Sequence, residues 1–225
     1  NNDSYENNFN CKNISHVIAE ILYISANALS SQNIYEFSNF YLNLSKYLNK
    51  NFHSFDTLLA ENFYQTKNFD KAKKIYKRIR NKGGAFNWYS SKQLSRIYLK
   101  QEDQNRALNL LANAYKSIQN KNIYETFDYA EFLKNNEKFE ESIIFYSKII
   151  KQIKKDHPLY PEATDGRGVA YERIGQWEKA EKDLLESLES DPEQAYVINY
   201  LAYSWIEQGI KIKKSLSMLE KANKL

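Results

Sequence analysis

The stretch that decides the fold runs from Gly168 to Pro192 and reads GVAYERIGQWEKAEKDLLESLESDP. Its first half places the aromatic Tyr171 three residues after Gly168, and Gly175 then marks a turn. Its second half carries small and apolar residues at helical spacing, at Ala180, Leu184 and Leu188. The stretch therefore predicts two helices that are joined by a short turn and end at a proline.

The same pattern recurs along the chain with a period of about 35 residues. A small residue opens the second helix of each expected pair: Ser38, Ala72, Ala107, Ser142, Ala180 and Ser215. The successive spacings are 34, 35, 35, 38 and 35 residues. A fixed period of this length is typical of solenoid proteins, in which each unit buries its apolar face against its neighbours.

We therefore predict an all-α chain of twelve helices in six repeats over residues 14–225, after a poorly ordered leader at residues 1–13. The approximate repeat bounds are 19–52, 53–87, 88–122, 123–160, 161–194 and 195–225. Glycine (6) and proline (3) are scarce, which suits helices joined by short turns and disfavours a β-sandwich.

The unit at Gly168–Pro192 resembles the tetratricopeptide repeat (TPR). The resemblance implies a solenoid of antiparallel helix pairs that forms a right-handed superhelix. It also implies that the first helices line a concave groove, which binds peptides or partner helices. Two stretches, 170–173 and 199–205, are similar to long TPR proteins of Gram-negative bacteria, chiefly alphaproteobacteria. This narrower resemblance implies a cell-envelope location, periplasmic in preference to cytoplasmic.

Some side chains of the first helices are expected to face this groove, because they lie one helical stripe away from the packed positions. They are Tyr89, Lys92, Arg96, Lys100, Tyr124, Phe127, Glu131, Tyr196 and Tyr203. Ordinary solvated helix surface would explain the same residues. Some TPR domains grip a C-terminal carboxylate with Lys, Asn and Arg from consecutive first helices. Here the matching places hold residues such as Thr57, Glu61, Tyr89 and Gln93, so we expect no such clamp.

Charge distribution offers a second hypothesis, binding of RNA or another polyanion. Residues 67–121 hold 14 Lys and Arg against 3 Asp and Glu, whereas residues 161–194 hold 4 against 10. Six of these cations, between Lys71 and Arg80, crowd one expected second helix. Basic clusters attract phosphate, but helical-repeat RNA readers use a regular base-reading code that the groove residues lack. We therefore expect nucleic-acid binding less than protein binding.

The residues of an enzyme site are not found in the sequence. His16, His53 and His157 have no His or Cys partner at metal-ligand spacing, and Cys11 has no neighbouring base. The chain has no glycine-rich phosphate loop followed by Lys and Ser or Thr. We therefore predict a non-catalytic interaction scaffold without cofactor or metal, whose partner is a protein or peptide. A structural spacer in a larger envelope protein is a third reading.

The two ends of the chain carry the remaining expectations. It begins without Met, and its last predicted helix offers Met218, Leu219 and Ala222 as an apolar face. We expect a piece of a longer protein in which further repeats follow, and the alternative is that this last helix joins two copies in a dimer. No apolar run approaches the roughly 18 residues of a membrane span, so we expect a soluble chain.

Overall fold

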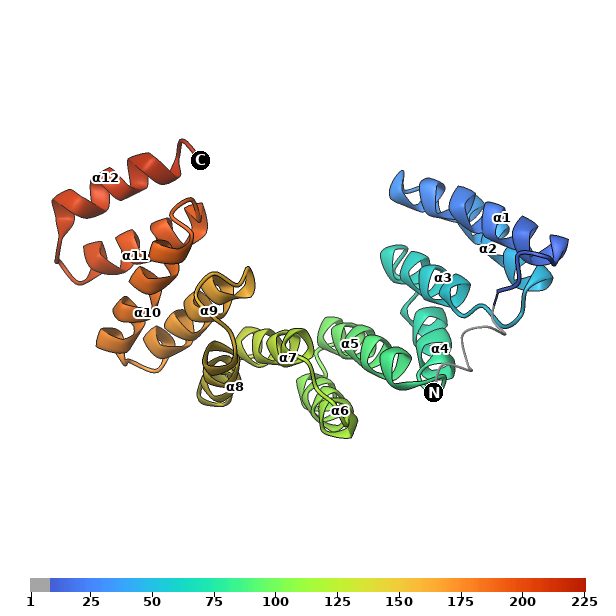
Figure 1. Ribbon diagram of the computed structural model, residues 1–225, viewed down its shortest axis with the longest axis horizontal. Coiled ribbons are helices and arrows are strands. Elements are labelled where there is room, and N and C mark those ends of the chain that lie inside the picture. The colour runs from blue at the N-terminus through green and yellow to red at the C-terminus, as the bar shows by residue number, and fades with distance from the viewer. Residues whose placement is uncertain (1–8) are drawn as a thin grey trace. The chain divides into compact units, whose positions relative to one another are not determined.

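The structure of the protein is a computed structural model that describes residues 9–225, and it contains α-helices and no strand within that range (Figure 1). The helices are α1 (Ile14–Ser31), α2 (Tyr35–Leu48), α3 (Ser54–Gln65), α4 (Phe69–Ile79), α5 (Gly84–Lys100), α6 (Gln104–Ser117), α7 (Ile123–Asn135), α8 (Phe139–Gln152), α9 (Leu159–Arg173), α10 (Trp177–Ser190), α11 (Ala195–Glu207) and α12 (Ile212–Ala222). The all-α prediction is confirmed. The first eight residues of the expected leader lie outside the described range.

The helices group into two compact units, one that ends at Ile118 and one that spans Gln119–Leu225. Within each unit, every helix packs against the next one along the chain. The helices form six consecutive pairs, and α1, α5 and α9 begin a few residues before the repeat bounds expected from the sequence. We keep those six repeats as the proposed division of the chain.

The first helix of every pair ends in the same turn, a Schellman motif. The second residue after the end of each first helix has a positive φ; these residues are Asn33, Lys67, Glu102, Glu137, Gly175 and Gly209. The next backbone N–H donates to a carbonyl five residues earlier, at 2.7–2.9 Å, which closes the motif. Those carbonyls belong to residues with large apolar or aromatic side chains, namely Leu29, Phe63, Tyr98, Leu133, Tyr171 and Trp205. The sequence period thus coincides with a repeated backbone turn.

Three of these turns hold side chains that disfavour the left-handed conformation. Lys67, Glu102 and Glu137 have φ of 58°, 61° and 61°. Only glycine adopts this region without a steric penalty. We expect Lys67→Gly, Glu102→Gly and Glu137→Gly each to raise the free energy of unfolding by about 0.5–1 kcal/mol. Urea unfolding followed by circular dichroism measures this change.

The matched control for this prediction is Glu102→Ala. It removes the same charge but keeps a Cβ at positive φ, so it should not stabilise the protein. Equal stabilisation by alanine and glycine would mean that the lost charge, and not the backbone conformation, is responsible.

A close helix contact shapes the C-terminal unit. The Tyr146 side chain of α8 is fully buried and lies directly against Gly166 of α9. A Cβ at Gly166 would stand 2.7 Å from Tyr146 Cζ and 2.9 Å from its Cε1. A Cβ at Gly168 would meet its neighbours at 3.1–3.3 Å, which is tight but less severe. Gly166 therefore sets how closely α8 and α9 approach.

The two glycines make a matched pair of substitutions. Overpacking costs about 1–3 kcal/mol, and alanine in a helix regains about 1 kcal/mol over glycine. We expect Gly166→Ala to lower the free energy of unfolding by about 1–2 kcal/mol, and Gly168→Ala to change it little. Urea unfolding checks both variants, and a Gly166→Ala variant about 1 kcal/mol more stable than the wild type would show that Tyr146 moves aside without cost.

The first helix pair is held mainly by small and polar side chains. Asn62 of α3 is fully buried, accepts a hydrogen bond from Ser30 (2.6 Å) and donates to Ser38 (2.8 Å) and Asn39 (2.9 Å). These bonds tie α3 to both α1 and α2. The buried residues of α1 are only Ala19 and Ala26.

The opposite side of this pair is apolar and exposed. Large hydrophobic side chains recur every three or four residues along α1 and α2 with 38–77% of their surface exposed: Ile14, Ile18, Ile21, Ile24, Phe37, Phe40, Leu44 and Tyr47. This surface was not predicted from the sequence, although the helical spacing of its apolar residues is visible there.

Candidate binding surfaces on the first helices

The nine residues predicted to face a groove all lie on first helices, and they fall into one group in each unit. Tyr89, Lys92, Arg96 and Lys100 lie on α5 in the N-terminal unit. The others lie on α7 and α11 in the C-terminal unit: Tyr124, Phe127, Glu131, Tyr196 and Tyr203.

In the N-terminal unit, Arg96 is held by its own chain. Its guanidinium donates to Glu61 Oε1 at 2.9 Å and stacks on the Tyr64 ring, 3.7 Å from the ring centroid. Burial lowers the pKa of Arg96, but the hydrogen bond and the charge of Glu61 outweigh it, so the net shift is upward. Arg96 and Glu61 occupy the same position in neighbouring repeats. This ion pair neutralises two charges that the helical spacing alone would place at the surface, open to a partner.

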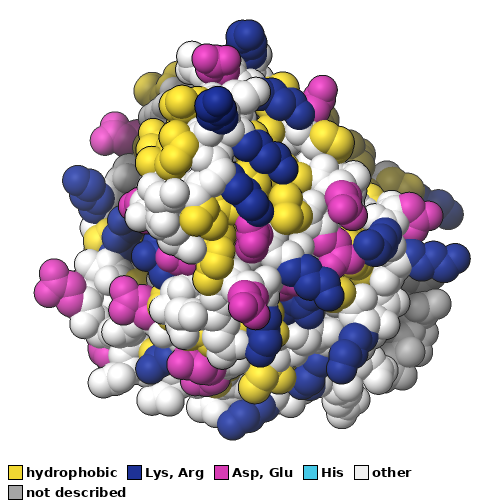
Figure 2. Space-filling model, turned by 90° about the vertical axis from the view of Figure 1, so that its left-hand side faces the viewer, with side chains coloured by type: hydrophobic (Ala, Val, Ile, Leu, Met, Phe, Trp, Pro, Cys, Tyr) yellow, Lys and Arg dark blue, Asp and Glu magenta, His cyan; other side chains and the backbone are white. Residues whose placement is uncertain are grey.

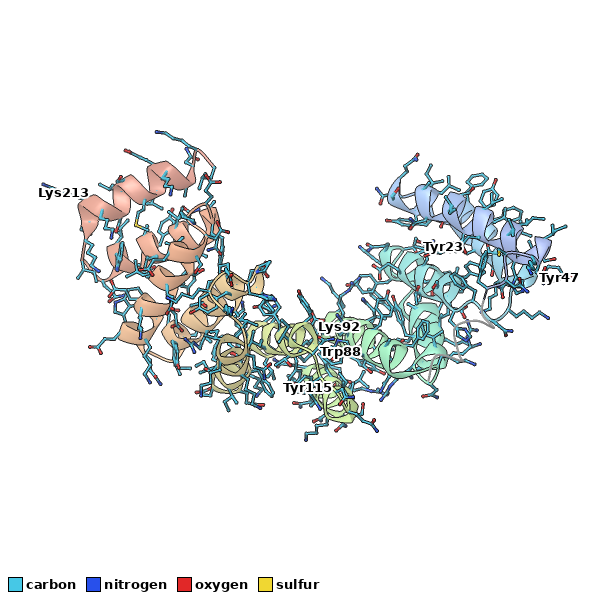
Figure 3. All side chains as sticks on the ribbon, viewed as in Figure 1. Tyr23, Tyr47, Trp88, Lys92, Tyr115 and Lys213 are labelled. Atoms are coloured by element: carbon cyan, nitrogen blue, oxygen red, sulfur yellow. The ribbon has the colours of Figure 1, made fainter. Side chains whose placement is uncertain are left out.

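The other α5 residues differ in how well they are placed to meet a partner. Tyr89 is half-buried, and its ring centroid lies 6.1 Å from that of Tyr76. Lys92 Nζ lies 5.8 Å from the centroid of the Trp88 ring, and both side chains can be followed on α5 in Figure 3. Lys100 is exposed at the end of the helix. The N-terminal group is therefore mostly an internal cluster with one exposed cation.

In the C-terminal unit, Glu131 has a similar internal role. It accepts a hydrogen bond from the Tyr146 hydroxyl and forms an ion pair with Lys134 Nζ at 2.7 Å. Glu61 and Tyr76 form the same kind of bond two repeats earlier, at 3.2 Å. Both pairs join a first helix to the second helix of the same repeat.

Next to this pair lies a carboxyl group with an unusual pKa. Burial raises the pKa of Asp165 on α9 to about 7, with further raising by Glu131 and Glu162 and a lowering contribution from Lys134. Phe127 packs against the buried Tyr146 with ring centroids 6.1 Å apart, whereas Tyr124 is 59% exposed. Of the predicted residues on α7, only Tyr124 is thus a freely accessible side chain.

One concave site in the C-terminal unit lies between α9 and α11. This hollow has a volume of about 330 Å³ and is lined by Glu172, Arg173, Tyr196, Asn199, Tyr200, Tyr203, Ser204 and Glu207. It contains two of the predicted residues, Tyr196 and Tyr203, which are 63% and 59% exposed. The structure therefore brings these two side chains together around a space that a ligand can enter.

Tyr200 and Glu207 also line the hollow, although neither was predicted from the sequence. The hydroxyl of Tyr200 donates to Glu172 Oε2 at 2.7 Å, and this bond between α11 and α9 holds the Tyr200 ring at the wall of the hollow. That bond and burial raise the pKa of Tyr200. The spacing of Tyr196, Tyr200 and Tyr203 places all three on one face of a helix, so this signal was present in the sequence.

The basic helix behind the nucleic-acid hypothesis is α4. Several of its cations contact their own chain: Lys73 pairs with Asp70 at 3.0 Å, Arg78 with Asp56 at 2.6 Å, and Arg80 donates to Asn87 at 3.0 Å. Ile75 and Ile79, on the other side of the same helix, are buried. Lys74 and Lys77 remain exposed on the outer face.

Residues 9–225 contain neither a metal-binding cluster nor a membrane-spanning helix. No group of three or more His, Cys, Asp or Glu side chains is placed to hold a metal ion there. None of the described helices has the length and apolar character that crossing a bilayer requires.

Comparison with known proteins places this architecture in a class. No family model matches the sequence, and no curated protein matches it either. Solved structures do match, and the class they define is that of helical-repeat proteins. Three of them are YrrB, a TPR protein with an unusual peptide-binding site, MamA of Desulfovibrio magneticus RS-1, and the C-terminal part of a TPR repeat-containing protein from Cytophaga hutchinsonii.

The similarity is one of structure at low sequence identity. The TM-scores are 0.54, 0.59 and 0.62 in that order, with 19%, 14% and 18% identity. The matches cover 79%, 77% and 89% of this chain, and 88%, 94% and 77% of the other chains. The protein therefore has the tetratricopeptide-repeat fold, as the resemblance in its sequence implied.

Proposed function

We propose that the protein is a non-catalytic scaffold that holds a segment of a partner protein on its first helices. The observation that carries the proposal is the tyrosine-lined hollow between α9 and α11, where Tyr196 and Tyr203 are exposed beside polar groups. Exposed aromatic side chains in a concave site supply contact area at low entropic cost. YrrB, a structural neighbour, is described as having a peptide-binding site, which supports the same kind of role.

The test is affinity capture from a lysate of the native organism, followed by mass spectrometry. The bait is compared with its Tyr196→Ser/Tyr203→Ser variant and with Tyr47→Ser, a matched control that removes a 77% exposed tyrosine from α2. Proteins that are lost with the double variant and kept with the control support the proposal. Identical sets from all three baits, or no captured protein, contradict it.

The α5 residues are a weaker place to begin. A Glu at position 96 would stand beside Glu61 and break a formed ion pair, so Arg96→Glu would perturb the fold as well as the surface. Lys100 is exposed, so Lys100→Glu changes the charge of the predicted groove without breaking an ion pair like that of Arg96. It is the cleaner variant for the N-terminal group.

Binding of RNA or another polyanion is supported less well, because three of the α4 cations are engaged by Asp70, Asp56 and Asn87. If it occurred, the affinity for a single-stranded RNA would fall steeply between about 50 and 200 mM salt. The absence of binding at low salt would remove this alternative.

Dimerisation through α12 and an envelope location remain parts of the proposal. On α12, Met218 packs against the core around Trp205, whereas Ile212 and Leu216 are 43% and 54% exposed. Figure 2 shows hydrophobic side chains interspersed with Lys and Arg at the top of this unit, where α12 lies. Sedimentation of the wild type and of Leu216→Lys tests self-association by this surface.

A further inference from the structure

The hollow between α9 and α11 has three aromatic walls with defined positions. Tyr196, Tyr200 and Tyr203 follow one another on one face of α11, and the first two ring centroids lie 5.9 Å apart at 40°. The hydrogen bond from the Tyr200 hydroxyl to Glu172 anchors the middle ring to α9. The outer two rings keep 63% and 59% of their surface exposed, so their faces are accessible to a ligand.

The charges around these rings favour a cation. Two carboxylates line the hollow, those of Glu172 and Glu207, against one guanidinium, that of Arg173. Arg173 is 56% exposed, and its Nε lies 3.5 Å from Glu172 Oε2, so it offsets only one of the two negative charges. An anionic ligand would therefore meet unfavourable electrostatics, whereas an ammonium or guanidinium group would meet favourable ones.

Elsewhere in the chain, aromatic rings of the repeats are covered by the chain's own cations. Lys71 lies over Phe63 at 5.2 Å, and Arg106 over Tyr98 at 4.5 Å. Two later repeats continue the pattern with Lys179 over Tyr171 at 5.3 Å and Lys211 over Trp205 at 4.4 Å. No Lys or Arg within residues 9–225 covers the ring of Tyr196 or Tyr203 in this way.

We propose that this hollow binds the side chain of a Lys or Arg residue carried by the partner segment. The cation would lie against the tyrosine faces and close to Glu172 and Glu207, as a ligand cation does in other aromatic cages. This inference rests on the proposed scaffold function, because it names the chemistry of the segment that the scaffold holds. It assigns specificity to charge as well as to apolar contact.

The test uses two small probes, one with and one without a charged side-chain end. Nα-acetyl-lysine methylamide and the uncharged Nα-acetyl-norleucine methylamide, whose side chain lacks the terminal ammonium group, are titrated into the isotope-labelled protein and followed by NMR. We expect the lysine probe to shift the amide signals of residues around the hollow, and the norleucine probe to bind at least about fivefold more weakly. Equal affinities, or no shifts around the hollow with the lysine probe, would overturn the inference.

Variants locate the binding. Tyr203→Leu removes an exposed ring, and Glu207→Gln removes a carboxylate without changing its shape. Each should weaken the lysine probe at least about threefold, whereas Tyr124→Leu, which removes a 59% exposed tyrosine from α7, should not. An unchanged affinity in both hollow variants would place the probe elsewhere and overturn the inference.

The outcomes separate this inference from the scaffold function. If a captured partner depends on Tyr196 and Tyr203 but norleucine binds as well as lysine, the scaffold function stands and the preference for a cation is wrong. If the lysine probe binds in the hollow but no partner is captured, the subsite stands and the scaffold proposal fails.

Discussion

Replacing Arg167 with leucine will lower the free energy of unfolding by about 3–5 kcal/mol, because it leaves the buried Asp183 carboxylate without its counter-ion. Arg167 Nε and its second terminal nitrogen donate to the two oxygens of Asp183 at 2.6 and 2.9 Å. The Asp183 residue is only 3% exposed. A third bond, to Ser147 at 3.2 Å, extends the contact to α8. The single guanidinium thus connects α8, α9 and α10.

Urea unfolding of Arg167→Leu measures this loss, and two further variants interpret it. Arg167→Leu/Asp183→Leu removes both charges and should recover much of the lost stability, since a buried pair is often replaceable by apolar side chains. Arg173→Leu removes a 56% exposed cation from the same helix and should change stability by less than about 1 kcal/mol. A single-variant loss as small as that of Arg173→Leu would show that water reaches Asp183.

Replacing Asp165 with asparagine will change how stability depends on pH. The pKa of Asp165 is raised to about 7 in the folded chain from the ordinary value of 3.8, mainly by burial. The folded state therefore binds the proton more tightly than the unfolded state. The contribution of Asp165 to the free energy of unfolding therefore falls as pH rises from about 4 to about 7, because its carboxyl group then ionises in a half-buried site. This contribution is constant at higher pH.

We expect Asp165→Asn to be more stable than the wild type at pH 8 by about 1–4 kcal/mol, and to lose this advantage near pH 4. The difference between the two unfolding free energies, measured by urea at several pH values, isolates this group from all others that titrate. Glu178→Gln, an exposed carboxylate change on α10, should give a nearly flat difference. A flat difference for Asp165→Asn too would mean that its pKa is ordinary.

The repeat could be predicted from the sequence because each unit carries the same spacing of large and small residues. The large residue near the end of each first helix accepts the hydrogen bond that closes the turn, and the small residue follows in the first turn of the second helix. The left-handed residue of that turn has a favourable residue type at Asn33, Gly175 and Gly209. In the other repeats, side chains such as Lys67 occupy a conformation that their residue type does not favour.

The candidate surface was harder to predict because ion pairs between side chains of different repeats decide which charges stay accessible. Spacing placed Arg96 on the predicted groove-facing stripe of α5, but its partner Glu61 stands 35 residues earlier, at the same position of the preceding repeat. No local pattern distinguishes a charge that faces solvent from one that a neighbouring repeat neutralises. Tyr196 and Tyr203 were identified because α11 itself carries the repeated aromatic spacing, which is a signal within one helix.

The small-residue packing of the first helix pair has a consequence for native-state opening. Because α1 buries only Ala19 and Ala26, little apolar area holds its backbone amides away from water. Local opening of α1 then costs less free energy than opening of helices that bury large side chains, such as α5 with Trp88 and Leu94. Amide hydrogens of α1 should therefore exchange with deuterium well before those of α5, and a protease should find its first cleavage sites there.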